Sequence, residues 1–189
     1  MIYLASRSPR RRDLLDQLRV DFGVLDLEID ESFPAGEAPE ALVRRLAVGK
    51  AEAGLALLAA GTTDTVIGAD TIVVVDDEVL GKPRDADHAC ELLGRLSGRC
   101  HRVLSAVAVA STAGTDVRVS ASRVCFRSIS PQECAAYAAT GEPLDKAGGY
   151  GIQGRGAAFV RDLQGSYSGV VGLPLYETAE LLREAGVAL

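Results

Sequence analysis

Hydrophobic residues along the chain follow two different spacings, and each spacing predicts a type of element. Runs rich in β-branched and other apolar residues predict strands. Apolar residues that recur every three or four positions predict helices. The predicted strands cover residues 2–5, 24–29, 66–75, 79–80, 102–110, 117–129 and 159–163. The predicted helices begin at residues 9, 39, 86, 131 and 174, and the last four of them end near residues 60, 97, 141 and 185.

Strands and helices occur in a mixed order, without the strict alternation of a parallel βαβ sheet. This order predicts an α/β or α+β fold. Since 189 residues are enough for one sizeable core, we expect one domain over residues 1–189, with room for two lobes around a cleft.

Local signals define several of the predicted helix starts and turns. Ser8 precedes Pro9 and Ser130 precedes Pro131, so each serine is a predicted N-cap with proline in the first helical position. Asp85 is the predicted N-cap of the third helix. The segment 76–78 predicts a hairpin turn, and Ala113-Gly114 predicts a second one.

The charge balance restricts the classes of partner. The net charge is −6, which disfavours non-specific binding to nucleic acid or to an anionic membrane surface. No run reaches the ~18 apolar residues that a membrane span requires, and Arg7 follows the first apolar residues too closely for a signal peptide. We expect a cytoplasmic protein with no nucleic-acid or membrane partner.

The four cysteines lack the spacing of a metal site. Cys90, Cys100, Cys125 and Cys134 form no CxxC pair. They are expected to be free thiols in a reducing compartment.

The start of the first helix carries an unusual number of arginines. Arg10, Arg11 and Arg12 occupy its first turn, where the helix dipole disfavours each cation by roughly 0.3–1 kcal/mol. A bound anion would explain them, because free N–H groups, guanidinium groups and the hydroxyls of Ser6 and Ser8 could converge on phosphate oxygens. The alternative is an exposed basic helix start without a ligand.

Asp70 lies within a run of β-branched residues, where aspartate is uncommon. A carboxylate buried there needs a cation, a metal or hydrogen-bond donors. Asp70 is therefore a candidate general base or magnesium ligand, and a structural ion pair is the alternative. In a regular strand Thr71 would point to the opposite face and offer the site only its backbone.

Other candidates are weaker when taken singly. The chain has 20 basic residues, of which only three are lysines. Lys82 is expected on a loop near Asp70, and Lys50, beside an apolar helix face, either extends to solvent or points into a cleft. Glu31 is a candidate second carboxylate for a metal. Gln153 lies in a glycine-rich segment and could read a base edge through its amide; a turn-rich loop without a ligand is the alternative.

Together these segments resemble the Maf family of nucleotide pyrophosphatases. The resemblance runs nearly end to end, through SRSPRR at 6–11, Glu31, Lys50, GADT at 68–71, GKPRD at 81–85, SGRCHRV at 97–103, DKAGGYGIQG at 145–154 and GSYSGVVGLP at 165–174. It implies a mixed twisted sheet in two lobes around a deep cleft, similar to the inosine-triphosphate pyrophosphatase architecture. It also implies homodimers and a link to arrest of cell division.

The resemblance further implies an activity and roles for residues. Nucleoside triphosphates would be cleaved between the α and β phosphates, with Mg²⁺ or Mn²⁺ as cofactor and Asp70 as the base. Arg10, Thr71 and Gln153 match the subgroup that acts on dTTP and UTP. We expect Lys50 and Lys82 to act with Asp70 in catalysis. Ser6, Ser8, Arg10 and Arg11 would bind phosphate, and Glu31 and Asp70 would hold the metal.

Three other functions remain to be distinguished from this one. A pyrophosphatase for damaged or deaminated purine nucleotides would show a different substrate preference. A nucleotide sensor acting through a partner in cell division would bind nucleotide without turnover. A DNA- or RNA-binding module that uses residues 7–12 conflicts with the acidic net charge.

Overall fold

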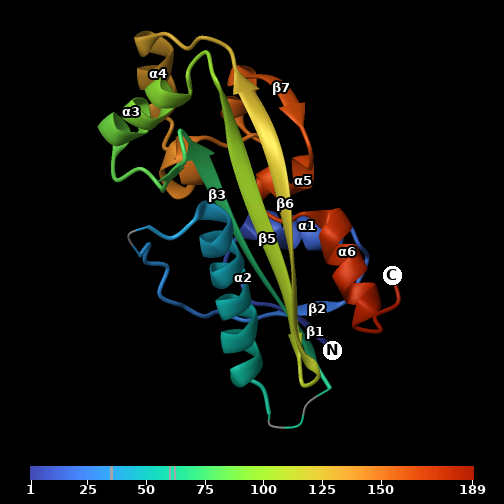
Figure 1. Ribbon diagram of the computed structural model, residues 1–189. Helices are drawn as coiled ribbons and strands as arrows, with labels where there is room; N and C mark the ends of the chain where they lie inside the picture. The colour runs from blue at the N-terminus through green and yellow to red at the C-terminus, as the bar shows by residue number, and fades with distance from the viewer. Residues whose placement is uncertain (35, 60, 62) are drawn as a thin grey trace.

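The computed structural model describes residues 1–34, 36–59, 61 and 63–189, and its strands form one twisted sheet (Figure 1). The sheet has seven strands in the order β2-β1-β3-β5-β6-β7, with β4 paired to β3. The strands are β1 (Ile2–Leu4), β2 (Phe22–Val24), β3 (Thr65–Val75), β4 (Glu78–Leu80), β5 (Cys100–Ser111), β6 (Gly114–Phe126) and β7 (Val160–Gln164). β1 is parallel to β2 and β3, and the other pairs are antiparallel.

Helices cover both faces of the sheet and one of its ends (Figure 1). They are α1 (Pro9–Asp16), α2 (Pro39–Ala56), α3 (Ala86–Leu96), α4 (Pro131–Ala138), α5 (Tyr167–Val171) and α6 (Leu175–Glu184). Three short 3₁₀ helices follow α4: η1 (Glu142–Asp145), η2 (Ala147–Gly149) and η3 (Arg155–Phe159). The mixed α/β fold class predicted from the sequence is confirmed.

Three apolar clusters lie where the helices meet the sheet. α2 packs on one face against Ile72, Val74 and Leu104. α1 and α6 pack on the opposite face, against a cluster that includes Ile67 and Val107. The third cluster joins α3 and α4 to the far end of β3, β5 and β6. Side chains that alternate along β3 therefore reach different helices.

The edge of β3 that faces β1 is only partly paired. β1 pairs with the first part of β3, over 65–67. β4 pairs with its last part, over 73–75. Within the described residues, no strand lies beside the stretch 68–72 on this edge. Asp70 and Thr71 lie in this gap, so no neighbouring strand of the described structure covers this edge of β3 at these two residues.

The predicted caps and the first hairpin turn are confirmed. The Ser8 hydroxyl accepts from the Arg11 N–H at 3.4 Å, and Ser130 forms a complete capping box with Glu133. The Asp85 carboxylate accepts from the N–H of His88 at 2.7 Å. In the turn before β4, Asp76 and Asp77 have φ of +52° and +61°, as a type I′ turn requires.

Several predicted boundaries are wrong. The strand predicted over 24–29 overlaps the observed strand β2 only at Val24. After the hydrogen bond from Leu25 N–H to Leu4 O, the chain leaves the edge of the sheet. Its side chains still alternate between half-buried and exposed up to residue 29, and this alternation produced the strand-like pattern. Helix α2 ends at Ala56, where the next N–H groups bond three residues back instead of four; residue 60, its predicted end, lies outside the described residues. β6 ends at Phe126, before residue 129.

The helix after Ser130 and the segment after β7 also differ from the prediction. α4 ends at Ala138, and the chain then turns through Gly141, whose φ is +74°. Helix α5 was not predicted; the Ser166 hydroxyl caps it by accepting from the N–H of Gly169 at 3.0 Å.

The expectation of four free thiols is wrong for two cysteines. Cys100 and Cys125 form a disulfide between β5 and β6, with an S–S distance of 2.02 Å. The antiparallel register places the two residues directly opposite each other. Cys90 and Cys134 are free, as expected.

Among the described residues, no helix is both long enough and apolar enough to cross a membrane.

Candidate active site

A cleft of about 1150 Å³ lies between α1 and α2 on one side and the glycine-rich segment after α4 on the other. Its walls come from the start of α1, the chain before α2, α2 itself, β3, the loop after β4 and the end of α5. The cleft brings together all the residues for which the sequence predicts a role: Ser6, Ser8, Arg10, Arg11, Glu31, Lys50, Asp70, Thr71, Lys82 and Gln153.

Lys50 joins the two carboxylates of the site. Its Nζ lies 2.6 Å from Asp70 Oδ1 and 2.6 Å from Glu31 Oε1. Asp70 is only 9% exposed and Lys50 only 8%, so this is the desolvated end of the cluster. A buried ion pair is stabilising only when its geometry is good and further hydrogen bonds satisfy both charged groups. Here the single ammonium of Lys50 contacts both carboxylates at 2.6 Å.

Gly68 allows the helix that carries Lys50 to approach β3 this closely. A Cβ atom at Gly68 would lie 2.3 Å from the Ala47 carbonyl oxygen and 2.4 Å from the Ala51 nitrogen. Any side chain there would push α2 away from the strand. The glycine two residues before Asp70 therefore contributes to the short distance between Lys50 and Asp70.

Charges across the cleft act on Glu31 and Arg11. Burial alone would raise the pKa of Glu31, but the hydrogen bond and charge of Lys50, with the charge of Lys82, lower it overall. Burial lowers the pKa of Arg11, whereas the negative charges of Asp70 and Glu31 act in the opposite direction. Glu31 is thus held as a carboxylate, and a guanidinium stays positive under all ordinary conditions.

The start of α1 presents hydroxyl and guanidinium groups to the cleft. Arg11 Nε donates to Gly172 O at 2.8 Å, and its Nη1 donates to Ser6 Oγ at 3.2 Å. Ser6 Oγ also accepts from the Ser8 N–H at 3.2 Å. These bonds fix Arg11 in place at the start of the helix, where the helix dipole favours an anion.

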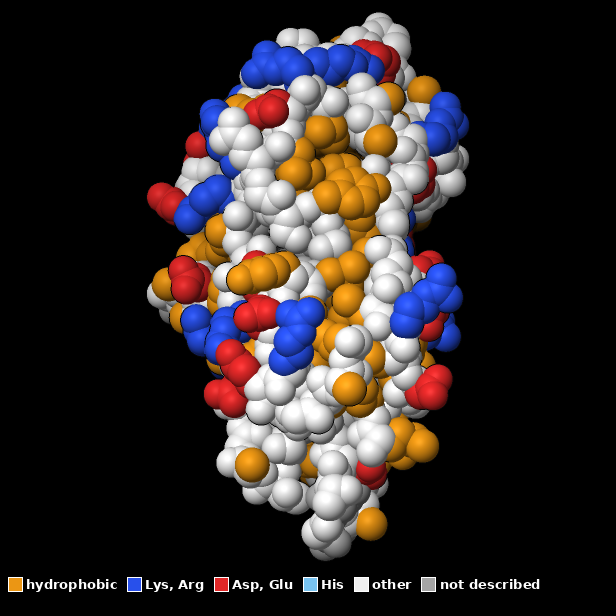
Figure 2. All heavy atoms as spheres, turned by 90° about the vertical axis from the view of Figure 1, so that its right-hand side faces the viewer, with side chains coloured by type: hydrophobic (Ala, Val, Ile, Leu, Met, Phe, Trp, Pro, Cys, Tyr) orange, Lys and Arg blue, Asp and Glu red, His pale blue; other side chains and the backbone are white. Residues whose placement is uncertain are grey.

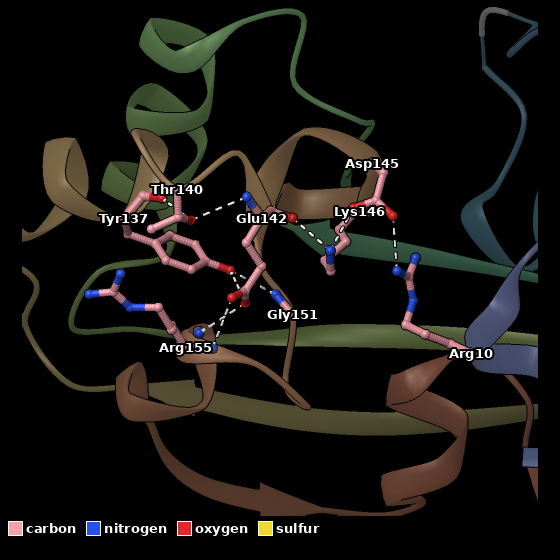
Figure 3. A network of polar contacts seen from close by, with 9 residues as sticks. Arg10, Tyr137, Thr140, Glu142, Asp145, Lys146, Gly151 and Arg155 are labelled. Carbon is pink, nitrogen blue, oxygen red and sulfur yellow. Dashed lines mark hydrogen bonds and ion pairs between the residues drawn. The ribbon is translucent and has the colours of Figure 1, made fainter. Parts of the chain in front are cut away.

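Arg10 spans the cleft to the segment after α4. Its Nη1 lies 2.9 Å from Asp145 Oδ2 (Figure 3). The Lys146 ammonium lies 2.5 Å from the other oxygen of Asp145 and donates to Glu142 O at 2.6 Å. A nucleotide that contacts the Arg10 guanidinium must therefore share it with Asp145 or replace that bond.

Thr71 lies on the face of β3 opposite Asp70, as the alternation predicted, yet it still lines the cleft. Its hydroxyl is 2.9 Å from Ser105 Oγ and donates weakly to Gly172 O at 3.4 Å. Among the described residues, the stretch of β3 that carries Thr71 has no neighbouring strand on the edge facing β1, and this brings Thr71 to the cleft wall.

Lys82 and Gln153 are exposed side chains on two loops of the cleft. Neither side chain forms a hydrogen bond or an ion pair within the described part of the chain. Both polar ends are therefore available to a ligand. Lys82 lines the same cleft as Glu31, and its positive charge contributes to the lowered pKa of that carboxylate.

Hydrogen bonds to Glu142 and Tyr137 fix the loop that carries Gln153 (Figure 3). The Glu142 carboxylate accepts from the Tyr137 hydroxyl at 2.8 Å and from the N–H groups of Arg155 and Gly156 at 3.0 and 3.2 Å. The Tyr137 oxygen in turn accepts from the Gly151 N–H at 3.0 Å. Backbone groups on both sides of Gln153 are thus attached to one carboxylate and one phenol.

The contact between this loop and Glu142 is too close for any side chain. A Cβ atom at Gly154 would lie 2.3 Å from Glu142 Oε1. Burial alone would raise the pKa of Glu142, but the donated bonds lower it overall. Glu142 is therefore a charged acceptor for the loop.

Glu142→Gln is expected to weaken this support. The amide has one acceptor oxygen, so its NH₂ group would face one of the donor N–H groups. We expect KM for the preferred nucleotide to rise several-fold with a smaller change in kcat, and the free energy of unfolding to fall by about 1–3 kcal/mol. Steady-state kinetics and urea unfolding measure the two effects. Glu180→Gln, which removes an exposed acid on α6, is the matched control and should change neither.

Tyr150 connects the cleft to a buried histidine. Its hydroxyl is 2.8 Å from His101 Nε2, and both residues belong to the aromatic cluster around Phe126. The other ring nitrogen of His101 is buried with no partner in the described structure. Burial lowers the pKa of His101 to about 4.

This histidine makes the fold sensitive to acid. The unfolded chain binds the proton at pKa ~6.5 and the folded one at about 4, so the contribution is fully present above pH 6.5 and is lost as pH falls toward 4. The difference corresponds to about 3 kcal/mol. We expect His101→Gln to flatten the urea-unfolding free energy between pH 6.5 and 4.5 relative to the wild type. An unchanged slope in the variant would contradict this assignment.

The donor groups of the cleft suit a hard divalent cation bound together with phosphate. Mg²⁺ commonly binds one or two carboxylates and completes its shell with water and substrate oxygens. Glu31 and Asp70 supply such carboxylates within reach of one ammonium. Among the described residues, no group of three or more acidic, histidine or cysteine side chains could hold a metal without help. The pair fits a metal that arrives with the triphosphate.

Sequence analysis missed the supporting residues of the site. Glu142, Tyr137 and His101 act through other residues, so no local pattern marks them. Asp145 lies in the glycine-rich motif, but its bond to Arg10 joins residues 135 positions apart. The distances that matter here become visible only after folding.

Comparisons with known proteins agree with the resemblance found in the sequence. A family model described as Maf-like protein matches residues 1–185. A dTTP/UTP pyrophosphatase of Methylobacillus flagellatus is 52% identical over 188 residues, covering 100% of this chain and 94% of that protein. A dTTP/UTP pyrophosphatase of Aromatoleum aromaticum is 49% identical over 199 residues, covering 100% of this chain and 97% of that protein.

A solved structure also matches in part. The Ham1 protein of Staphylococcus aureus superposes with a TM-score of 0.47 and 18% sequence identity, over 66% of this chain and 71% of that one. The family model and the identities across the whole chain establish the family: this chain belongs to the Maf-like proteins.

Proposed function

We propose that this protein is a nucleoside triphosphate pyrophosphatase that hydrolyses dTTP and UTP to the monophosphate and pyrophosphate. The observation that carries the proposal is the Asp70–Lys50–Glu31 cluster in a cleft of about 1150 Å³ that also holds two arginines of α1. The relatives with about 50% identity over the whole chain carry the name dTTP/UTP pyrophosphatase, which supports this choice of substrate.

Asp70 is the proposed general base. It orients a water molecule, or takes its proton, for attack on the α-phosphorus, and pyrophosphate leaves. Lys50 lies against the same carboxylate and holds it in place. Lys82, Arg10 and Arg11 neutralise the phosphates, and Ser6 and Ser8 donate to phosphate oxygens. Catalysis rests mainly on positioning and electrostatic stabilisation.

Glu31 and Asp70 are the proposed ligands of a divalent cation, Mg²⁺ or Mn²⁺. When bound, the cation would neutralise negative charge on the triphosphate. The Lys50 ammonium would then interact both with the two carboxylates and with the phosphate oxygens of the bound nucleotide.

The proposed base-reading groups are Arg10, Thr71 and Gln153. Gln153 has an unused amide on a loop whose backbone is fixed by Glu142. Thr71 is fixed by Ser105, and Arg10 by Asp145. Fixed polar groups favour a base that matches their donors and acceptors over one that leaves them unpaired.

A substrate panel tests the proposal. Purified protein is incubated with dTTP, UTP, CTP, dATP, GTP and ITP and with Mg²⁺ or Mn²⁺, and monophosphate, pyrophosphate and orthophosphate are resolved. Preferred turnover of dTTP and UTP to monophosphate and pyrophosphate is the expected result. Preference for ITP would favour the deaminated-purine enzyme, and tight binding without turnover would favour a sensor.

A nucleic-acid-binding function has less support. Arg7 pairs with Asp26 and Glu28, and Arg10 pairs with Asp145, so two of the four arginines within residues 7–12 are engaged with acids. On the face shown in Figure 2, acidic and basic side chains are interspersed rather than gathered into a basic stripe. The homodimer, the single domain over residues 1–189, the cytoplasmic location and the link to cell division stay predictions from the sequence.

A further inference from the structure

The disulfide lies at the end of the β5–β6 pair farthest from the hairpin turn. Cys100 and Cys125 are directly opposite each other, with Cα atoms 3.9 Å apart. The next pair, Arg99 and Phe126, is linked by a backbone hydrogen bond of 2.8 Å, so the cysteines occupy a non-hydrogen-bonded position, where opposed residues come closest. Register alone therefore brings the two sulfur atoms together, whether or not they are bonded.

The two sulfur atoms differ in access. Cys125 is 3% exposed, whereas Cys100 is half-buried and lines a surface hollow of about 210 Å³. Arg123 lies beside Cys100 in the lining of this hollow. A small molecule that enters it meets the sulfur of Cys100 and not that of Cys125.

A cation lies against the accessible sulfur. Arg123 Nη2 donates to Cys100 Sγ at 3.2 Å. A neighbouring guanidinium stabilises a thiolate, so Cys100 is the better leaving group when the sulfur carries an external partner. Cys100 is therefore the cysteine of the pair that has an accessible sulfur atom, a neighbouring guanidinium and a partner cysteine directly opposite.

We propose that Cys100–Cys125 is a reversible thiol–disulfide exchange site for small monothiols of the glutathione class. The thiolate of one small thiol attacks Cys100 Sγ and forms a mixed disulfide. The Cys100–Cys125 bond breaks, and Cys125 takes its electron pair and then a proton. A second thiolate attacks the small-molecule sulfur, and Cys100 leaves as a thiolate beside Arg123. The protein gains two electrons, and two small thiols become one small-molecule disulfide; the reverse reactions restore the bond.

The other two cysteines provide an internal reference. Cys90 is half-buried and Cys134 is buried, and burial raises the pKa of Cys134. Neither forms a disulfide in the described structure, so the oxidised protein is expected to contain two free thiols.

Counting thiols in the wild-type protein tests the site without any variant. Protein purified without reductant is denatured and alkylated, and its mass is measured. We expect two alkylated cysteines, and four after the folded protein has first been incubated with millimolar reduced glutathione. Four at the outset would mean that the bond does not persist. Two after incubation would mean that the folded protein does not exchange. Either result overturns the proposal.

Single variants test which sulfur reacts. After incubation with oxidised glutathione, Cys125→Ser is expected to gain one adduct at Cys100, located by peptide mapping, whereas Cys100→Ser gains none. Cys90→Ser is the matched control and should exchange like the wild type. An adduct on Cys125 or on Cys90, or equal labelling of both single variants, would contradict the assignment of Cys100 as the reactive sulfur.

Discussion

Asp70→Asn is expected to lower kcat for dTTP by a factor of about 10²–10⁴, the usual contribution of a general base. Asparagine has nearly the same shape as aspartate but cannot take a proton from water. Asp70 is 9% exposed, contacts Lys50 at 2.6 Å and lies on the unpaired stretch of β3, so no other carboxylate in the described site has the same position. Pyrophosphate release under steady-state conditions measures the effect.

A matched control separates chemistry from folding in this experiment. Asp116→Asn makes the same change at an exposed position of β6, and it should keep wild-type kinetics. Thermal unfolding should show that Asp70→Asn is still folded at the assay temperature. Full activity in a folded Asp70→Asn protein would show that Asp70 is not the base.

Lys50→Met is expected to have the largest effect on stability. The change leaves Asp70 and Glu31 without the ammonium that contacts both at 2.6 Å. Removing one partner of a buried ion pair commonly costs 3–5 kcal/mol; since the side chain of Glu31 is 50% exposed, we expect about 3 kcal/mol here. Activity should fall at least as far as in Asp70→Asn. Urea unfolding and the same pyrophosphate assay measure both losses.

The other side of α2 supplies the control. Arg44 forms an exposed pair with Glu40 at 3.9 Å, so Arg44→Met should change the free energy of unfolding by less than about 0.5 kcal/mol. In an Asp70→Asn background, Lys50→Met should cost clearly less than in the wild type, because the buried acid is already neutral. Equal costs in the two backgrounds would show that Lys50 and Asp70 are not coupled.

The residues that carry the chemistry could be identified from the sequence more readily than their arrangement in space. Asp70 stood out because a carboxylate in a β-branched run needs a partner, and the first turn of α1 because its arginines oppose the helix dipole. Both signals are local. The unpaired edge of β3 is not local, since it depends on where β1 and β4 pair along that strand. For this reason the family resemblance could place Thr71 at the site, but the strand pattern alone could not show how Thr71 reaches the cleft.

The disulfide shows a signal that the sequence contained but spacing rules overlooked. Cys100 lies twelve residues before Thr112, and Cys125 lies twelve residues after Ala113. Since these two turn residues join β5 and β6, both cysteines are equally far from the turn and must face each other in an antiparallel pair. Glu142 offered no such signal, because its partners are backbone N–H groups of a distant loop.

Hydrolysis in water enriched in ¹⁸O tests the central claim most directly. Wild-type protein is incubated with dTTP and the preferred divalent metal, and the products are analysed by mass spectrometry. Attack of water on the α-phosphorus predicts one ¹⁸O atom in the monophosphate and none in the pyrophosphate. Label in pyrophosphate, or release of orthophosphate with the nucleoside diphosphate, would contradict the proposed reaction.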